Sequence, residues 1–563
     1  MCGIAGIYTG RRENLARRAR AAVEIVSHRG PDSVNIAYSD MEENPAGFYG
    51  ALALARLATV DVNGPAPPIE SGDGRFCAAL NGEIWNYRSL RDRLTSRGFP
   101  FRTAGDTEVA LQSVADEGAR APARFKGQFA YVVEDRREGI LHAGRDPHGI
   151  CPLFYGWNGQ GEFILGSTIG VLLQNAVEPS GIRAVPQGYT LVCHPKSGAI
   201  DFHRYYDIGG RIPCGEPAPS TETIREVLFD AIREKIPDEV DYVTMLGGMD
   251  SSLVTVVCAS CPRPPKAVIT VSTTEDRDSS DMGNAGTISE KFGLQSRIGI
   301  IDEAYIGSNL ERVVANLGSA NYLSVLAGIA GLKAAEMARE VAAKVILTGG
   351  GADEIFGGYE FVWNLFDPKR VEANLLHLYR QSGVFECHRE DGVTAAVGIE
   401  ARPAYYDTGL AEMVLSTPVS RRISGLGTAE VNEKALLKEI ARGYLPGGII
   451  RRKKSPLYRS TSILRLFEKV ADRMITNREA EEWRAQALRE NPSWLPALAM
   501  SYKGPVLIHR TFSSLFPGCE KLPLPWGPPD YEDPDSYGRF HGFFGSPCLE
   551  GFVGVQRART NVI

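Results

Sequence analysis

The sequence predicts a two-domain protein with an α+β first domain, an α/β second domain built on a parallel sheet, and a short irregular tail. Three observations lead to this prediction. The chain has 563 residues, more than one compact core usually holds. Short β-rich runs dominate its first third, and strands then alternate with longer helices. The predicted bounds are 1–207 for the first domain, 221–518 for the second and 519–563 for the tail.

The first domain is predicted to be rich in hairpins. Its β-rich runs are GFYGALALARL, FAYVVED, GILHAGR, FILGS and YTLVCH, and turn residues separate them. Two stretches, near 13–26 and 107–120, have the apolar spacing of amphipathic helices. This mixture of many short strands and few helices is typical of an α+β fold.

The second domain begins after the break IGGRIPCGEPAPS at 208–220. The runs YVTML, KAVITVS and KVILT are predicted strands, with helical stretches between them that include a long Ala-rich one around 325–342. Such alternation describes a parallel sheet covered by helices. From about residue 360 the pattern is mainly helical, and the tail from residue 519 is rich in Pro, Gly and aromatic residues, which cannot sustain a helix.

Composition excludes several classes of protein. Hydrophobic residues make up 43% of the chain and charged residues 23%, and 62 basic against 68 acidic residues give a formal net charge of −6, which argues against a dedicated nucleic-acid binder. Neither a membrane-spanning run nor a secretory signal is visible, so we expect a cytoplasmic protein without a membrane partner.

The ten cysteines are scattered, which is typical of reduced thiols in a cytosolic protein. The single CxxC of Cys258 and Cys261 has no second pair at zinc spacing. The chain also lacks a GxxxxGK[ST] phosphate loop and a complete GxGxxG, which disfavours kinase and dinucleotide-binding functions.

The first candidate for chemistry is Cys2, in the opening MCGIAGIY. A small second residue permits removal of Met1. Cys2 would then carry both a thiol and a free α-amine with a pKa of about 8, and that amine can serve as the base for its own nucleophile.

The motifs that follow are MCGIAGIY, SHRGPDS, LARLATVDVNG, NGEIWNY, GDTEVAL and GRDPHGICPLFYG, in this order. Their order and spacing resemble those of class II glutamine amidotransferase domains over about the first 200 residues. The resemblance implies an N-terminal nucleophile (Ntn) hydrolase fold of four αββα layers. It also implies L-glutamine as a substrate, whose amide the N-terminal cysteine attacks to give a thioester and ammonia.

The resemblance also implies roles for individual residues. Arg56 would hold the glutamine carboxylate, and Asp106 with the backbone near Glu83 would hold its α-amino group, since a carboxylate pairs with a guanidinium and an ammonium with a carboxylate. Asn81 and the Gly82 backbone NH would form the oxyanion hole, where one preorganised donor is worth about 3 kcal/mol.

The second domain carries LGGMDSS at 246–252, after a predicted strand. This motif resembles the SGGLDSS of glutamine-hydrolysing asparagine synthetases and of the related β-lactam and carbapenam synthetases. The likeness implies an ATP-pyrophosphatase domain (adenine nucleotide alpha hydrolase-like), with ATP and Mg²⁺ as cofactors and AMP and pyrophosphate as products. The implied pyrophosphate-binding residues are Leu246, Gly247, Gly248, Asp250, Ser251 and Ser252, and Asp250 is also an implied Mg²⁺ ligand.

Four further segments extend the resemblance nearly to the end of the chain: TGGGADEIFGGY, GIEARPAYYD, IIRRKKSPL and RTFSSLFPG. They imply that Gly349 contacts ATP, that Asp353 is a second Mg²⁺ ligand, and that Lys454 contacts the α-phosphate and the acyl carbon, a task suited to a point charge. The implied acceptor pocket consists of Gly350, Glu354, Glu400 and Arg402. The family also allows a homodimer.

Departures from the family pattern point to a changed acceptor. Leu246 replaces a serine hydroxyl of the pyrophosphate loop, and Gly350 replaces a glutamate that is thought to take a proton from ammonia in asparagine synthetases. Thr394 and Ser455 also differ from the family residues. We therefore expect a carboxylic acid acceptor that is larger than free aspartate. Candidates for the missing base are Glu354, Glu400, the acceptor and water.

Three interpretations remain open. The first is an amidotransferase that joins glutamine-derived ammonia to an adenylated carboxylate, with a true asparagine synthetase as its special case. The second is a ligase that uses another nitrogen nucleophile and forms a lactam or a hydroxamate. The third is a regulator without activity, which Leu246 and Gly350 permit. The residues that oppose it are Asp250, Ser251, Asp353 and Lys454.

Overall fold

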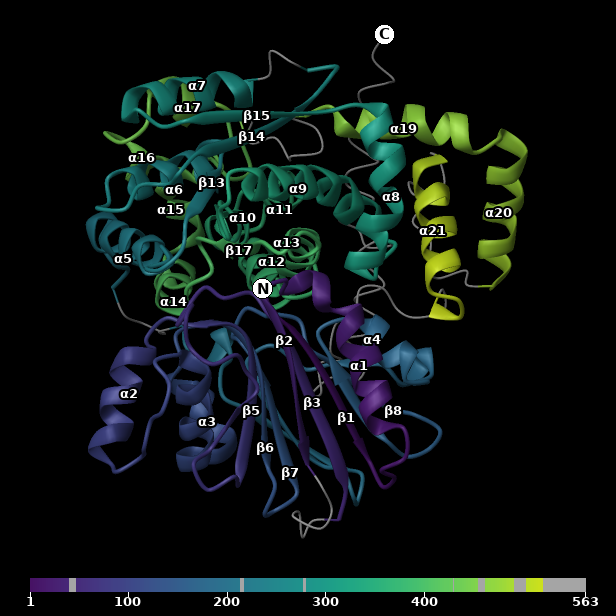
Figure 1. Ribbon diagram of the computed structural model, residues 1–563. Helices are drawn as coiled ribbons and strands as arrows, with labels where there is room; N and C mark the ends of the chain where they lie inside the picture. The colour runs from purple at the N-terminus through teal and green to yellow at the C-terminus, as the bar shows by residue number, and fades with distance from the viewer. Residues whose placement is uncertain are drawn as a thin grey trace.

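The computed structural model describes residues 1–39, 47–212, 217–276, 280–428, 430–453, 461–490 and 503–519. In Figure 1 the N-terminal part forms the lower half of the molecule and the later part the upper half, with the N-terminus near the boundary between them.

Two antiparallel six-stranded sheets form the N-terminal part. The first has the order β10-β8-β9-β1-β3-β2 and the second the order β12-β11-β7-β6-β5-β4. The strands of the first sheet are β1 (Gly3–Thr9), β2 (Ser33–Ser39), β3 (Tyr49–Arg56), β8 (Phe154–Trp157), β9 (Phe163–Gly166) and β10 (Arg183–Ala184). Those of the second are β4 (Ile69–Glu70), β5 (Phe76–Ile84), β6 (Gly127–Asp135), β7 (Ile140–Arg145), β11 (Tyr189–His194) and β12 (Ala199–Arg204).

Helices cover the outer face of each sheet, so the order of layers is αββα (Figure 1). α1 (Leu15–Ile25) and α4 (Ile169–Gln174) pack on the first sheet, and α2 (Tyr87–Ser96) and α3 (Asp106–Glu117) on the second. Short 3-10 helices lie at Ser27–Arg29, Gly118–Arg124, Pro179–Gly181 and Ile208–Gly210.

The alternation of side chains along β1 explains this layering. Ile4 and Tyr8 belong to the core between the two sheets, whereas Ala5 and Ile7 belong to the core beneath α1. Both faces of the strand are therefore buried, which is why its sequence is an almost unbroken apolar run.

The C-terminal part is built on a parallel sheet of order β15-β14-β13-β16-β17. Its strands are β13 (Tyr242–Met245), β14 (Val268–Thr273), β15 (Ser296–Ile301), β16 (Val345–Thr348) and β17 (Glu400–Pro403). One face packs on α6 (Met249–Ala259) and α7 (Ser280–Phe292), with α5 (Thr221–Arg233) beside α6, and the other face on α8 (Glu303–Leu317) and α9 (Tyr322–Glu340).

The remaining helices surround this sheet. They are α10 (Ala352–Phe356), α11 (Glu360–Trp363), α12 (Pro368–Arg380), α13 (Glu386–Ala395), α14 (Thr408–Ser416), α15 (Val419–Arg422), α16 (Ala435–Ala441), α17 (Gly447–Arg451), α19 (Ile463–Met474), α20 (Asn477–Glu490) and α21 (Lys503–Leu515). The predictions of an αββα domain and of a parallel-sheet α/β domain are therefore confirmed.

The strand order of this sheet creates a place for a ligand. The chain runs from β13 outward to β14 and β15, then returns to β16 on the opposite side of β13. The loops after β13 and β16 therefore diverge at the carboxyl ends of neighbouring strands, where open α/β sheets usually bind their ligands. Each loop leads directly into a helix, α6 or α10.

The sequence did not predict helix α2, and the structure does not describe the predicted tail. Helix α2 was missed, because its sequence YRSLRDRLTS buries only Tyr87, Leu90 and Leu94 and otherwise reads as polar. The tail beyond Cys519 lies outside the described residues. Among the residues that are described, no single helix is long and apolar enough to cross a membrane, and one pair, α8 and α9, meets such a test only together and with a bend of 112°.

Candidate active sites

Cys2 lies at the start of β1, at the edge of a small pocket in the N-terminal domain. Its side chain is buried, and its Sγ atom accepts a hydrogen bond from the Leu57 amide at 3.4 Å and lies 3.7 Å from the Leu57 carbonyl oxygen. Burial raises the pKa of the Cys2 thiol, while the nearby N-terminal ammonium opposes the increase. The thiol therefore needs a base before it can act as a nucleophile.

Asn81 and Gly82 lie near the end of β5. The Asn81 side chain is completely buried, yet neither its amide nitrogen nor its amide oxygen has a hydrogen-bond partner among the described residues. Buried polar groups are rarely left unpaired without a reason. Gly82 has a φ of +98°, and a Cβ atom there would lie 2.0 Å from the Gln128 carbonyl oxygen, so only glycine fits.

Arg56 and Asp106 line the same pocket as Cys2 and Gly82. The Arg56 guanidinium donates to the carbonyl oxygens of Val60, Asp61 and Gly64, which fix its orientation. Asp106 begins α3 and accepts a hydrogen bond of 3.0 Å from the Ile84 amide. Burial raises its pKa to about 6. The pocket thus holds a thiol, a guanidinium and a carboxyl group.

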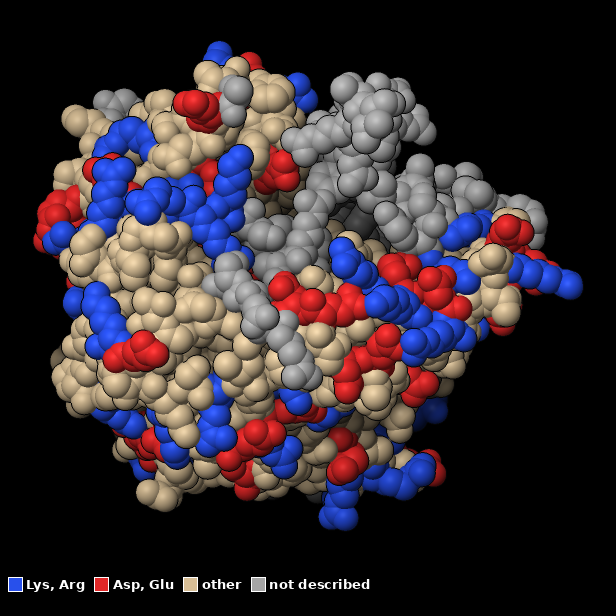
Figure 2. All heavy atoms as spheres, turned by 90° about the horizontal axis from the view of Figure 1, so that it is seen from above, with Lys and Arg blue, Asp and Glu red and all other residues tan. Residues whose placement is uncertain are grey.

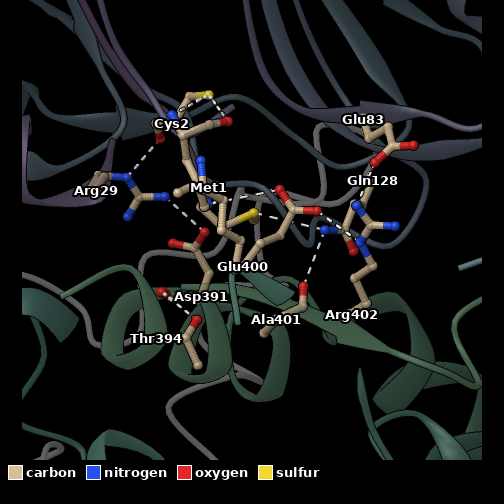
Figure 3. A network of polar contacts seen from close by, with 12 residues as sticks. Met1, Cys2, Arg29, Glu83, Gln128, Asp391, Thr394, Glu400, Ala401 and Arg402 are labelled. Carbon is tan, nitrogen blue, oxygen red and sulfur yellow. Dashed lines mark hydrogen bonds and ion pairs between the residues drawn. The ribbon is translucent and has the colours of Figure 1, made fainter. Parts of the chain in front are cut away.

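A buried polar network joins this domain to the edge strand β17 of the second domain (Figure 3). Arg402 forms an ion pair with Glu83 and donates to Glu400 at 2.9 Å. Desolvation raises the pKa of Glu83 to about 7, against the opposing charge of Arg402. Gln128 donates to the Ala401 carbonyl oxygen at 3.1 Å.

A second ion pair crosses the same interface. Arg29 donates to the Cys2 carbonyl oxygen at 2.9 Å and to Asp391 at 2.8 Å, and both charged side chains are almost completely buried. Met1 is present in the structure and lies buried beside this contact, with its ammonium 3.8 Å from Glu400. Helix α13, which carries Asp391, is thereby tied directly to the backbone of the cysteine.

The second candidate site is a cavity of about 250 Å³ at the carboxyl ends of β13 and β16. The loop Leu246–Gly248 and the first turn of α6 form one wall. Ser251 and Ser252 both donate to the Gly248 carbonyl oxygen, and the Gly247 amide donates to the Ser251 hydroxyl at 3.0 Å. Leu246 is buried and donates its amide to β14.

Gly349 and Gly351 shape the opposite wall. A Cβ atom on Gly349 would lie 2.9 Å from the Ser251 amide nitrogen, so glycine lets the two loops meet closely. Gly351 has a φ of +93°, in the left-handed region that favours glycine. Together these glycines bring Asp353 to the same cavity as Asp250.

Lys434 links those two carboxylates. Its ammonium lies 2.6 Å from Asp250 and 2.5 Å from Asp353, and its side chain is only 2% exposed. Gly358 makes room for this cluster, since a Cβ atom there would lie 1.8 Å from an Asp353 oxygen. Sequence reasoning missed Lys434, because a lysine in VNEKALLKEI reads as a solvated helix residue.

The two carboxylates suit a Mg²⁺ ion that is shared with a nucleotide. Mg²⁺ is commonly held by one or two carboxylates together with substrate phosphates and water. Asp250 and Asp353 lie in the first turns of α6 and α10, and both contact the Lys434 ammonium. In the part of the chain that the structure describes, no group of three or more His, Cys, Asp or Glu side chains is arranged to hold a metal. The remaining ligands would come from the phosphates.

Comparisons with known families match both halves of the chain. The family model described as "Glutamine amidotransferase domain" matches residues 1–197, and that described as "Asparagine synthase" matches 223–375 and 364–494. The chain belongs to the glutamine-hydrolysing asparagine synthetase family. The prediction of a glutamine-hydrolysing carbon–nitrogen ligase is confirmed with it.

Relatives in this family align along most of their length. The chain is 23% identical over 539 residues to asparagine synthetase B of Escherichia coli (strain K12), covering 92% of each chain. It is 27% identical over 478 residues to the asparagine synthetase of Asparagus officinalis, covering 81% of this chain and 76% of the relative. It is 26% identical over 482 residues to asparagine synthetase 2 of Arabidopsis thaliana, with coverages of 81% and 78%.

Of the residues predicted to form the acceptor pocket, only some line the cavity. Gly350 lines the cavity, whereas Glu354 lies behind it, where it accepts a hydrogen bond from Tyr359. Burial and the neighbouring Glu386 raise the pKa of Glu354 well above its usual range. Because Glu354 does not line the cavity, it is poorly placed to accept a proton there.

Glu400 and Arg402 do not line the cavity but lie in the domain interface described above. The reason is that β17 is the edge strand of its sheet and faces the N-terminal domain. Thr394 is also buried, and it donates to the Glu390 carbonyl oxygen of its own helix. Lys454 and Ser455 lie outside the described residues, although the preceding Lys453 lines the cavity.

The cavity has basic and acidic lining groups that sequence reasoning did not assign. The basic ones are Lys434, Lys438, Arg389, Arg452 and Lys453. The acidic ones, besides Asp250 and Asp353, are Asp281, Glu386, Glu390 and Glu433. On the molecular face seen from above in Figure 2, basic and acidic side chains are likewise interspersed. The cavity lining therefore carries charges of both signs.

Proposed function

We propose that the enzyme transfers the amide nitrogen of glutamine to a carboxylic acid that the second domain has activated with ATP. The products would be an amide, glutamate, AMP and pyrophosphate. Two observations carry the proposal. The buried side-chain amide of Asn81 has no hydrogen-bond partner among the described residues, and a cavity lined by carboxylates lies where the loops after β13 and β16 diverge. Buried ion pairs that cross the interface join the two domains.

In the first domain, Cys2 would attack the glutamine amide once Met1 has been removed. Its own α-amine would take the thiol proton, which is needed because burial disfavours the thiolate. Asn81 and the Gly82 amide would then donate to the developing oxyanion. Arg56 and Asp106, which line the pocket, would hold the α-carboxylate and the α-ammonium of glutamine.

In the second domain, backbone amides at the start of α6 would bind the phosphates of ATP. Mg²⁺ would be held by Asp250 and Asp353 and would neutralise phosphate charge when bound. Lys434 keeps these carboxylates together, and the basic lining of the cavity, with Lys454, would stabilise charge on the α-phosphate. Ammonia would cross the domain interface near Arg402 and Gln128.

We propose that the acceptor is larger than free aspartate. Aspartate carries two carboxylates, so its site needs fixed cationic partners. The lining residue Arg389 is paired with Glu386 at 3.3 Å, and the Glu390 carboxylate beside Gly350 adds a further acidic group. Gly350 itself contributes no side chain. This environment favours a less anionic acid.

A true asparagine synthetase is the second candidate. It is favoured by relatives of that name that align over as much as 92% of this chain. A ligase that forms a hydroxamate or a lactam is the third, because Gly350 replaces the family's acid. The amidotransferase, the asparagine synthetase and the hydroxamate-forming ligase would each take their nitrogen from glutamine or a related compound. The pocket around Cys2 supports such a nitrogen donor.

The test is to measure pyrophosphate exchange into ATP with aspartate, glutamate and larger monocarboxylic and peptide acids. Glutamine, Mg-ATP and each active acid are then combined, and amide and AMP are measured together. We expect AMP and amide in equal amounts with a larger acid. Stoichiometric asparagine at a kcat of about 1 s⁻¹ or more would contradict the acceptor assignment.

A further inference from the structure

Helix α13 places an acidic side chain, that of Glu390, beside Gly350. Glu390, on α13, extends its carboxylate to the end of β16, where it accepts a hydrogen bond of 2.8 Å from the Thr348 hydroxyl. The Thr348 oxygen in turn accepts a hydrogen bond of 3.2 Å from the Gly350 amide. One threonine therefore fixes the carboxylate against the turn that contains Gly350.

The space beside Gly350 has no room for a side chain. A Cβ atom there would lie 2.8 Å from the Pro403 Cβ atom and 3.1 Å and 3.3 Å from the two Glu390 carboxylate oxygens. Contacts under about 3.0 Å require something to shift. Gly350 therefore packs directly against Pro403 and Glu390, and the Glu390 carboxylate lies where a side chain of residue 350 would begin.

Glu390 also lines the cavity that contains the nucleotide loops. Gly247, Gly248 and Asp353 line the same space. Under the proposed function, the activated acyl carbon and the incoming nitrogen meet in this cavity. A carboxylate here can reach a proton on that nitrogen in a way that Glu400, in the domain interface, and Glu354, behind the wall, cannot.

The groups that face Glu390 suit it to accepting a proton. Glu386 and Arg389 come from its own helix, and Thr348 comes from β16. Burial and the charge of Glu386 raise the pKa of Glu390 to about 7, while Arg389 and Thr348 oppose that increase. Asp353 and Glu354 of α10 and Tyr359 contribute further acidic groups around the cavity. A base whose pKa lies near the working pH is the most effective.

We propose that Glu390 is the general base of the synthetase reaction, replacing the acidic side chain that this chain lacks at position 350. This role rests on the proposed function. The nitrogen lone pair attacks the acyl carbon, so that a C–N bond forms. The nitrogen gives one proton to the Glu390 carboxylate, and the C–O bond to the phosphate breaks with its electron pair leaving on AMP.

The decisive variant is Glu390→Gln, which keeps the shape of the side chain and can still accept from Thr348. Aspartate, glutamate and the larger acids of the exchange panel serve as acceptors, and ammonium serves as nucleophile. We expect amide formation to fall by about 10² to 10⁴-fold, the usual contribution of general base catalysis. Pyrophosphate exchange and glutamine hydrolysis should stay within about threefold of the wild-type rates.

Two further measurements separate a base from a packing residue. Hydroxylamine is less basic than ammonia, and its adduct loses a proton more readily. E390Q should therefore slow the reaction with hydroxylamine less than it slows the reaction with ammonium. The neighbouring variant Glu386→Gln removes one carboxylate from the same helix. With rates divided by the concentration of unprotonated ammonia, it should move the lower limb of the pH profile for amide formation toward lower pH, because a charge that raises the pKa of Glu390 is gone, whereas E390Q should abolish that limb.

The outcomes are distinct. Equal loss of exchange and amide formation in E390Q would assign Glu390 to acceptor binding and overturn its role as base. Retention of both activities, or equal loss with ammonium and hydroxylamine, would overturn it as well. A wild-type enzyme that supports no exchange with any acid would overturn the proposed function itself, and with it this role.

Discussion

Replacing Lys434 by Met should destabilise the second domain strongly. The ammonium is 2% exposed and lies within 2.6 Å of two carboxylates that are each 12% exposed. Removing one partner of a buried ion pair costs about 3 to 5 kcal/mol, because charge is left uncompensated. Here two carboxylates would face each other, but both border the cavity, and water relieves part of the cost. We therefore expect a loss of about 3 kcal/mol.

The assay is urea unfolding followed by a signal from the second domain, with and without Mg²⁺. A matched control is Lys266→Met, whose ammonium also lies 2.6 Å from a carboxylate, that of Asp241, but on the surface. That change should cost no more than about 1 kcal/mol. Glutamine hydrolysis at Cys2 reports on the other domain and should be unaffected.

Two results would refute this reasoning. The first is a loss of less than about 1 kcal/mol in K434M, equal to that of K266M. The second is the absence of any rescue when Asp353→Asn is added to K434M, since removing one of the two neighbouring negative charges should restore part of the stability. Mg²⁺ should stabilise K434M more than the wild type, because the ion takes the place of the ammonium.

Further predictions concern both active sites and their interface. Cys2→Ala should abolish glutamine-supported synthesis but leave some synthesis with ammonium at high pH, and equal loss of both would contradict the division of labour. Lys454→Met should suppress acceptor-dependent AMP formation and spare glutamine hydrolysis; AMP release within about threefold of wild type would exclude it as the catalytic lysine. Because the folded protein holds the Glu83 pKa at about 7, above its ordinary 4.5, stability present at low pH should be lost as the pH rises between these values. Glu83→Gln should flatten that dependence in urea unfolding, and an unchanged slope would refute the assignment.

Local sequence signals predicted the elements that depend on neighbouring residues. Strand β1 needs apolar residues because both of its faces are buried. Gly351, after β16, needs to be glycine because its φ is positive. Gly82, inside β5, is another example, because its φ of +98° lies in the left-handed region that favours glycine. Such signals placed LGGMDSS directly after a strand, and β13 does end at Met245.

Long-range placement was not predictable in the same way. Glu390 lies on α13 and Lys434 directly precedes α16, and only the tertiary packing of these two helices brings both side chains to the cavity. Glu400 and Arg402 were expected in the acceptor pocket. They lie in the interface because β17 is an edge strand, a property of sheet order that the local sequence does not encode.

The most direct test of the account uses glutamine labelled with nitrogen-15 in its amide group, together with Mg-ATP, an acid that supports pyrophosphate exchange, and unlabelled ammonium at a concentration and pH at which ammonium alone supports no measurable synthesis. The account predicts labelled amide, with one glutamate and one AMP formed for each amide. Unlabelled amide would contradict the transfer of nitrogen between the domains, and ADP in place of AMP would contradict activation of the acceptor as an acyl-adenylate.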